Sequence, residues 1–146
     1  MLYLFDIDGT LSNLEHRLHY IQQEPADWNS FYQAAGADSA IFEVITVARA
    51  LGDSGHLILA PTGRSETIRG ITAEWLRKYR VPVHRLYMRK DGDHRDDSVV
   101  KAEMLAQIIA DFPNHKIGGV FEDRQSVVDM WRGKGLKVFQ VAEGKF

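Results

Sequence analysis

Two aspartates near the start of the chain, Asp6 and Asp8, are the side chains best placed to do chemistry. They follow the apolar run Leu2–Phe5, which predicts a buried strand, and Gly9 lets the backbone turn after them. Residues two apart on a strand share a face at a spacing of about 6–7 Å, so one carboxylate can attack an atom while the other transfers a proton. The alternative is a simple turn in which Asp8 only accepts hydrogen bonds from backbone amides.

A second group of polar residues follows a later apolar run, 57–60. Thr62, Gly63 and Arg64 lead from this run into a helical pattern, where a hydroxyl and free amides can bind an anion. We expect Thr62 to contact a phosphate. Ser65 is better explained as the N-cap of the helix.

Lys101 stands out because of its position in a helical pattern over residues 98–112. It lies on the apolar stripe of that helix and in its first turn, where packing and the helix dipole both disfavour a cation. An anionic partner at the top of the sheet would explain the lysine. The alternative is that its long side chain reaches solvent.

Two more acids, Glu122 and Asp123, follow the apolar run 117–121. If they meet Asp6 and Asp8, four carboxylates repel one another, and a hard cation relieves that repulsion. Oxygen ligands without histidine favour magnesium, so all four residues are candidate metal ligands. The alternative is an acid pair that only bonds the amides at a helix start.

These residues need an alternating set of strands and helices to bring them together. Apolar runs of strand length at 2–5, 57–60, 83–88, 117–121 and 136–141 alternate with helical patterns at 40–51, 66–79, 98–112 and 125–132. This alternation predicts an α/β fold with a parallel sheet covered on both faces. Ligands of such sheets bind beyond the carboxyl ends of the strands, where the polar residues above follow.

The segment 12–38 interrupts the first crossover of the predicted sheet. We expect two short helices separated at Pro25, forming a small helical lid over the site and not a second domain. The whole chain, 1–146, is then one domain. Trp28 and Phe31 are expected to form the core of the lid, with base stacking as the less favoured alternative.

Composition excludes several classes of protein. The 146 residues carry a net charge of −2 and no cysteine, so disulfides, thiolate zinc sites and cysteine nucleophiles are excluded. No apolar run reaches the length of a membrane span, and we expect a cytoplasmic protein with no membrane partner. Residues 77–95 contain seven Lys or Arg but only two acids. This local excess of positive charge indicates either an anion-binding surface or a solvated helix end and loop.

The order Asp-x-Asp-Gly-Thr-Leu, Thr-Gly-Arg, Lys and Glu-Asp resembles the haloacid-dehalogenase-like (HAD) phosphatase superfamily. The runs 92–101, 122–132 and 139–144 are more closely similar to the phosphatase domain of phage polynucleotide kinase. This resemblance implies a Rossmann-like three-layer α/β/α sandwich whose five parallel strands lie in the order 3-2-1-4-5. The sequence has no Gly-x-x-x-x-Gly-Lys-Ser/Thr loop, so the kinase half is absent from it.

The resemblance also implies a catalytic mechanism. Asp6 is the nucleophile that forms an aspartyl-phosphate, and Asp8, with a raised pKa, is the general acid and base. Thr62 and Lys101 hold the phosphoryl group. Mg²⁺ is bound by the carboxylate of Asp6, the main-chain carbonyl of Asp8 and the carboxylate of Asp123.

Other roles follow with less support from the motifs. Relatives usually carry aspartate where this chain has Glu122, so the longer side chain could shift the metal geometry or hold a water. Arg64, Arg17 and Arg95 are the candidates for contacts to the substrate.

The predicted activity is magnesium-dependent removal of a 3′-phosphate from a polynucleotide end. Free nucleotides or other small phosphate esters are the alternative substrates. A phosphoryl-accepting module of the receiver type is a lower-ranked alternative, because such modules normally carry the accepting aspartate after the third strand. A further alternative is a silent subunit paired with a separate kinase or ligase, which is also a possible partner of an active enzyme.

Overall fold

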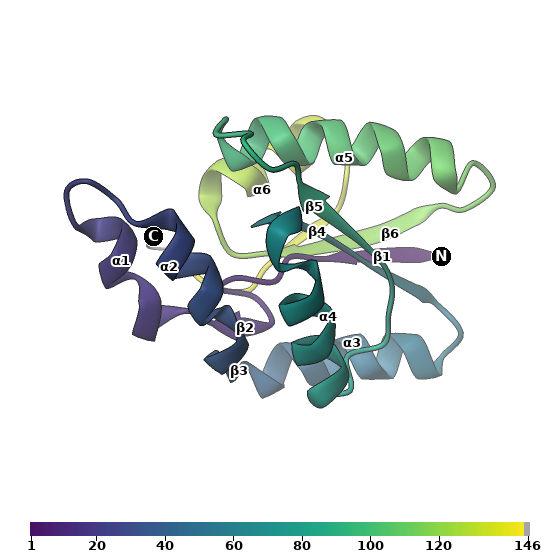
Figure 1. Cartoon of the computed structure of the whole chain (residues 1–146). Helices are drawn as coiled ribbons and strands as arrows, with labels where there is room; N and C mark the ends of the chain where they lie inside the picture. The colour runs from purple at the N-terminus through teal and green to yellow at the C-terminus, as the bar shows by residue number, and fades with distance from the viewer. Residues whose placement is uncertain (145–146) are drawn as a thin grey trace.

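A five-stranded parallel sheet forms the centre of the protein in the computed structural model, which describes residues 1–144 (Figure 1). The strands are β1 (Leu2–Phe5), β4 (Leu57–Ser65), β5 (Val83–Arg89), β6 (Ile117–Glu122) and β7 (Val138–Gln140). Their spatial order is β5-β4-β1-β6-β7, and every neighbouring pair is parallel. Numbered along the chain, this is the predicted order 3-2-1-4-5, which is confirmed.

Helices cover both faces of the sheet, as Figure 1 shows. One face carries α5 (Asp97–Asp111) and α6 (Gln125–Gly133), and the other carries α3 (Phe42–Asp53) and α4 (Arg69–Lys78), which follows a short 3-10 turn, η3 (Glu66–Ile68). Alternate residues of β1 serve the two cores, because Leu2 and Leu4 pack toward α5 and α6 while Phe5 packs toward α3. The three-layer sandwich is therefore the predicted one.

Stacked aromatic rings link three adjacent strands. Phe5 stacks on Phe121 with ring centroids 4.3 Å apart, and Phe121 stacks on Phe139 at 4.8 Å. Gly119 leaves room for this stack, because a Cβ there would come within 2.7 Å of the Phe139 ring. The stack fixes β1, β6 and β7 side by side, and so fixes where Asp6 and Asp123 emerge.

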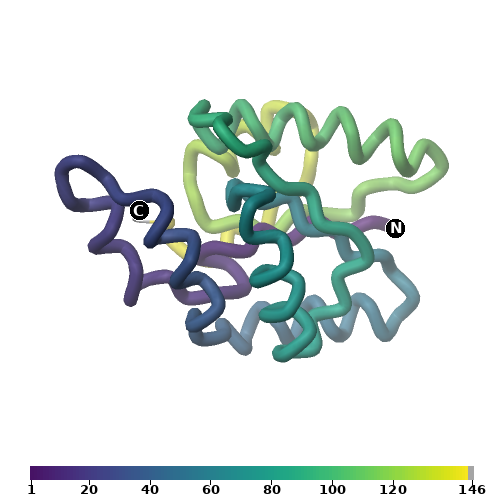
Figure 2. The backbone as a smooth tube through the Cα atoms, viewed as in Figure 1, coloured from purple at the N-terminus to yellow at the C-terminus, as the bar shows by residue number. Residues whose placement is uncertain are grey.

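The insertion after β1 contains the two short helices expected on either side of Pro25. They are α1 (His19–Gln22) and α2 (Trp28–Gln33), with 3-10 turns η1 (Glu15–Arg17) and η2 (Ala34–Ala37) beside them. An antiparallel pair, β2 (Ser12–Asn13) with β3 (Ser39–Ala40), closes the insertion at its base. Figure 2 shows this segment beyond the carboxyl ends of the strands, to the left of the sheet.

Two strand boundaries differ from expectation. β4 continues to Ser65 instead of ending near residue 60, and its pairing with β5 is irregular between Pro61 and Ser65. The proline has no N–H for a regular ladder, so the strand bulges where the site begins. β7 is shorter than the run 136–141, since Leu136 packs against the core from outside the strand.

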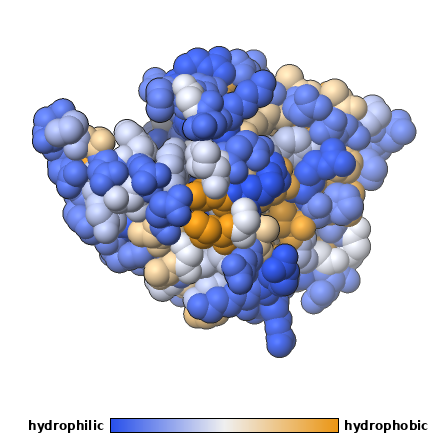
Figure 3. Space-filling view, viewed as in Figure 1, coloured by the Kyte–Doolittle hydropathy of each residue, from blue (hydrophilic) through white to orange (hydrophobic). Residues whose placement is uncertain are grey.

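The basic segment 77–95 does not form a single surface, because Arg89, Lys90 and Arg95 line a pocket at the strands' carboxyl ends and the other basic residues of the segment do not. Arg77 and Lys78 end α4, at the far end of the sheet from the strands' carboxyl ends, and Arg85 pairs with Asp111 at the end of α5. Figure 3 shows hydrophilic residues over most of this face of the molecule, with a small hydrophobic group near its centre. Over the described residues, no helix combines the length and apolar character that crossing a membrane requires.

Candidate active site

The carboxyl ends of the strands open into a pocket of about 650 Å³. Strand-end residues make one side of it and the lid makes the other. The residues lining it include Asp6, Asp8, Thr62, Arg95, Lys101, Glu122, Asp123 and the lid residues Trp28 and Tyr32. The pocket therefore brings most of the predicted site residues together from positions spread over more than a hundred residues of sequence.

Three acids meet at the base of this pocket. Carboxylate oxygens of Asp6, Glu122 and Asp123 lie within 4.8 Å of one another, and all three residues are buried. The hydroxyl of Thr10 lies 3.1 Å from Oδ2 of Asp6 and 3.3 Å from Oδ1 of Asp123, so it can donate to either acid. The predicted meeting of early and late acids is present, and Thr10 is a member of the cluster that sequence reasoning left out.

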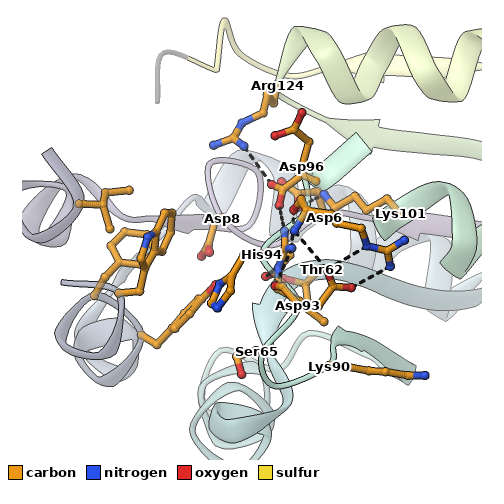
Figure 4. A pocket seen from close by; sticks show the side chains of 18 of the residues that line it. Asp6, Asp8, Thr62, Ser65, Lys90, Asp93, His94, Asp96, Lys101 and Arg124 are labelled. Carbon is orange, nitrogen blue, oxygen red and sulfur yellow. Dashed lines mark hydrogen bonds and ion pairs between the residues drawn. The ribbon is translucent and has the colours of Figure 1, made fainter. Parts of the chain in front are cut away.

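Lys101 supplies the positive charge of the cluster. Its Nζ donates to Oδ1 of Asp6 at 2.6 Å and to Oε2 of Glu122 at 2.9 Å, and the residue is 1% exposed (Figure 4). Burial would lower its pKa, but the charges of Asp6 and Glu122 raise it above the ordinary value. The prediction that an anionic partner explains this lysine is confirmed, with acids of the chain itself as partners.

One ammonium does not balance three buried acids. Burial and the charge of Glu122 raise the pKa of Asp6 well above its ordinary value, against the opposing effect of Lys101. Burial also raises the pKa of Asp123, to about 6, with a contribution from the charge of Glu122. A bound divalent cation would remove this penalty and favour the ionised acids, and the oxygen-only donor set suits Mg²⁺. The residues present therefore fit the metal.

Glu122 is the acid least available to such a cation. Its Oε2 accepts from Lys101 and, at 3.4 Å, from Nε1 of Trp131, while its Oε1 accepts from the backbone amides of Asp123 and Arg124. Burial opposes ionisation, but Lys101 brings the pKa of Glu122 below its ordinary value. Asp6 and Asp123 are thus the better direct ligands, and Glu122 orients the lysine and the turn after β6.

Asp8 lies nearer the lid, and its surroundings correct two predictions. Its Oδ1 accepts from Nη2 of Arg17 at 2.7 Å and from Nη2 of Arg64 at 2.8 Å. Both arginine side chains are 0% exposed and hold Asp8 from the protein interior. Neither lines the pocket, so the prediction that they contact the substrate is wrong. Burial alone would raise the pKa of Asp8, but the two guanidinium charges bring it far below its usual range, opposite to the expected direction.

Asp38 completes this network from the end of the lid. Its Oδ1 accepts from Nε of Arg17 at 2.7 Å, and its Oδ2 accepts from Nη2 of Arg17 at 2.7 Å and of Arg64 at 3.1 Å. Nε1 of Trp75 in α4 donates to the Asp38 carbonyl at 2.9 Å. The lid is therefore fastened to the sheet beside Asp8 by buried charges. Nothing in the sequence near Asp38 marked it, since it stands in no motif.

Thr62 and Gly63 form the wall beside the acids. Thr62 is 1% exposed, and its Oγ1 accepts from the backbone amide of Arg64 at 3.1 Å, which leaves its hydrogen to donate into the pocket. Gly63 lies against Asp97, because a Cβ at position 63 would be 2.5 Å from Oδ1 of Asp97. The side chain of Ser65 accepts from the amide of Thr67 and caps η3, as predicted.

Arg89 organises the loop after β5 and was not predicted. Its Nε donates to the carbonyl of Gly63 at 2.8 Å, and its Nη1 donates to the carbonyls of Asp93 and Arg95 at 3.1 and 2.6 Å. Its Nη2 pairs with Asp97. The loop is thereby held against the wall of the pocket. Its place at the end of a buried strand was the signal that could have identified it.

Arg95 is the one predicted substrate-contacting arginine that lies on the pocket wall. Its side chain is half exposed and pairs with Asp93 at 2.9 Å and Glu103 at 2.6 Å. These two acids already use its donors, so a substrate contact would require it to exchange partners.

Replacing Asp38 with alanine is expected to lower the free energy of unfolding by about 3–5 kcal/mol, because two buried guanidinium groups lose a shared carboxylate. Urea unfolding measures this cost. The matched control is Asp129→Ala, since Asp129 is exposed and bonds only Gln125 among the contacts described for it. Equal, small losses in both variants would show that the network does not hold the lid.

Magnesium is expected to stabilise the protein more at neutral than at acid pH. The pKa of Asp123 is about 6 when folded against an ordinary value of 3.8, so the metal-free fold retains that proton and loses stability as the pH rises from about 4 to 6. The metal needs the ionised form, so the rise in Tm with Mg²⁺ over EDTA should be larger at about pH 7.5 than at about pH 5. The Asp123→Asn variant should lose this difference, and an equal rise at both pH values would contradict the site.

Comparison with known proteins agrees with this geometry. The family model of the polynucleotide kinase PNKP phosphatase domain matches residues 1–146. Chains of two solved structures of a Pnkp1/Rnl/Hen1 complex, one titled an RNA repair complex, share 30% identity with 99% of this chain, with TM-scores of 0.85 and 0.81. This chain spans only 43% and 46% of those chains.

More distant structures share the fold. The class C acid phosphatase from Bacillus anthracis is 14% identical over 99% of this chain and 67% of its own, with a TM-score of 0.68. A putative beta-phosphoglucomutase from Thermotoga maritima is 13% identical over 95% and 84%, with a TM-score of 0.64. The fold, the meeting of the acids with Lys101 and the match over the whole chain lead to one conclusion: this chain belongs to the family of polynucleotide kinase phosphatase domains and is a HAD-type phosphatase.

Proposed function

We propose that this phosphatase is magnesium-dependent, works through an aspartyl-phosphate and removes 3′-phosphates from polynucleotide ends. The observation that carries the proposal is the pairing of Asp6 with Lys101 at 2.6 Å, next to Asp123, on the floor of an open pocket. A carboxylate held in this way by a cation can approach a phosphate that is itself negatively charged.

The metal has an evident place in this scheme. Asp6 and Asp123 would hold it with their carboxylates, assisted by the main-chain carbonyl of Asp8, while Glu122 supports the site through Lys101. When bound, Mg²⁺ supplies positive charge that neutralises the phosphate oxygens and keeps the acids ionised.

In the first step, a carboxylate oxygen of Asp6 attacks phosphorus as the bond from phosphorus to the ester oxygen breaks. Asp8 gives its proton to the departing oxygen, which leaves as an alcohol. Lys101 and Thr10 fix the Asp6 carboxylate from its two sides. Thr62 and Lys101 are the groups that would hold the phosphoryl oxygens during transfer.

In the second step, Asp8 accepts a proton from water, which attacks the phosphorus of the aspartyl-phosphate. Inorganic phosphate leaves, and the Asp6 carboxylate is restored. The hydrogen bonds described for Asp8 all reach Oδ1, so Oδ2 is the oxygen that would carry the proton. Arg17 and Arg64 favour the ionised Asp8, which suits its role as a base and requires the incoming phosphate to raise its pKa for its role as an acid.

The polymer substrate is inferred from the family and not from the catalytic groups. The related Pnkp1 chains are described in an RNA repair complex with Rnl and Hen1, so we propose a nucleic-acid substrate and a separate kinase or ligase as partner for this chain. Free nucleotides and other small phosphate esters are the second candidate, since the catalytic groups contact only the phosphate. Membership of a phosphatase family overturns the receiver-type alternative.

The Asp6→Asn variant is expected to lose hydrolysis of phosphate esters while remaining folded, because the neutral amide is a poor nucleophile of nearly the same size. Release of inorganic phosphate from an aryl phosphate in Mg²⁺ measures the loss, and circular dichroism checks the fold. Asp129→Asn, on the surface of α6, is the matched control. Chelation of the metal should stop hydrolysis by the wild-type protein, and added Mg²⁺ should restore it. Retained turnover in the Asp6→Asn variant would show that Asp6 is not the nucleophile.

A panel of substrates separates the two candidate functions. A 3′-phosphorylated oligonucleotide is expected to have a higher kcat/KM than a 5′-phosphorylated oligonucleotide of the same sequence and than a nucleoside 3′-monophosphate. Similar values for the oligonucleotide and the mononucleotide would favour the small-ester function. DNA and RNA versions of the same oligonucleotide complete the comparison.

A further inference from the structure

We propose that the pocket-facing side of α2 binds the nucleobase of the phosphate-bearing nucleotide, with Trp28 as the stacking platform. This inference rests on the proposed function, because it concerns the organic part of the same substrate. It adds a specificity-determining surface on the lid, away from the acids and Lys101.

Trp28 is exposed where a core residue was expected. It is 47% exposed yet lines the pocket, so the prediction that it forms the lid's core is wrong, while Phe31 is 4% exposed and does form that core. Phe31 meets Trp28 edge to face at 5.6 Å, and its own ring is covered by Arg17 at 4.3 Å. The indole is therefore braced from behind and leaves surface open toward the pocket.

The neighbours of Trp28 have the chemistry of a base-binding surface. Asn29, Tyr32 and Gln33 also line the pocket from α2, and the spacing of four residues puts Tyr32 beside Trp28 and Gln33 beside Asn29. Trp28 and Tyr32 lie 6.0 Å apart with an interplanar angle of 35°. Two aromatic rings offer stacking area, and two amides offer both donors and acceptors for the edge of a base.

The tyrosine also connects this surface to the catalytic groups. Burial raises the pKa of Tyr32, and the charges of Arg89, Asp97 and Asp8 act on it. Tyr32 and the acids Asp6 and Asp8 line the same pocket. A nucleotide whose phosphate lies at Asp6 can extend its base toward α2 without leaving the pocket.

The opposite wall offers few free charges for other parts of the substrate. Arg89 and Arg124 pair with Asp97, and Arg95 pairs with Asp93 and Glu103. In Figure 4, Lys90 points away from the lid, whereas His94 lies on the side of the loop that faces it. A nucleic-acid backbone would have to compete with these acids for the arginines. Stacking is then the main source of binding energy beyond the transferred phosphate.

Two readouts test the proposal. The first compares deoxyadenosine 3′-monophosphate with 2-deoxyribose 3-phosphate, which lacks the base. Trp28→Ala should lower the ratio of their kcat/KM values about tenfold, the scale of one lost base stack, and Trp28→Phe should restore most of it. The matched control is Phe42→Ala, since Phe42 is 56% exposed on α3 and lies outside the pocket lining.

The second readout needs no turnover. Trp75 and Trp131 are buried at 2% and 0% exposure, so Trp28 is the solvent-exposed fluorophore among the three tryptophans. In EDTA, deoxyadenosine 3′-monophosphate should quench this emission, and 2-deoxyribose 3-phosphate should quench it much less. Trp28→Phe should abolish the difference.

The outcomes separate this proposal from the proposed function. An unchanged kcat/KM ratio in Trp28→Ala, or equal quenching by both esters, overturns the stacking site even if the enzyme is fully active. Absence of hydrolysis by the wild-type protein overturns the proposed function, and base-dependent quenching in the same sample would still support the stacking site.

Discussion

The structure depends on a buried excess of negative charge at the carboxyl ends of two strands, β1 and β6. Asp6, Glu122 and Asp123 are held within 4.8 Å of one another, with one ammonium, that of Lys101, between two of them. Such an arrangement is unfavourable by itself, because burial and mutual repulsion raise the pKa values of Asp6 and Asp123. A divalent cation bound to these carboxylates would relieve the repulsion.

Packing supplies the rigidity that the acids need. The stack of Phe5, Phe121 and Phe139 fixes the two strands from which the acids emerge. Lys101 reaches the acids because it faces the core as the fifth residue of α5, and it is only 1% exposed to solvent. Packing of the apolar layers therefore sets the distances among the charged groups.

A second buried network ties the lid to the chemistry. Arg17 comes from the lid, Arg64 from β4 and Asp38 from the lid's far end, and all three meet beside Asp8. The position of Arg17 against the ring of Phe31 links this network to the aromatic core of the lid. The same small segment can thus orient the proposed general acid on one side and present Trp28 to the substrate on the other.

The sequence by itself determined the sheet order, the helices, the lid and the meeting of Asp6, Asp123 and Lys101. Periodic burial and strand-end position are local signals that survive in one dimension, and the ordered motifs carried the resemblance. The tertiary structure alone decided the partners of Arg17 and Arg64, the exposure of Trp28, the position of Asp38 and the hydrogen bonds of Arg89. A side chain's partner depends on residues distant in sequence, so the same arginine can serve a substrate or a buried aspartate. Only the folded chain shows that Arg17 and Arg64 face Asp8 and that the indole of Trp28 lies open to the pocket.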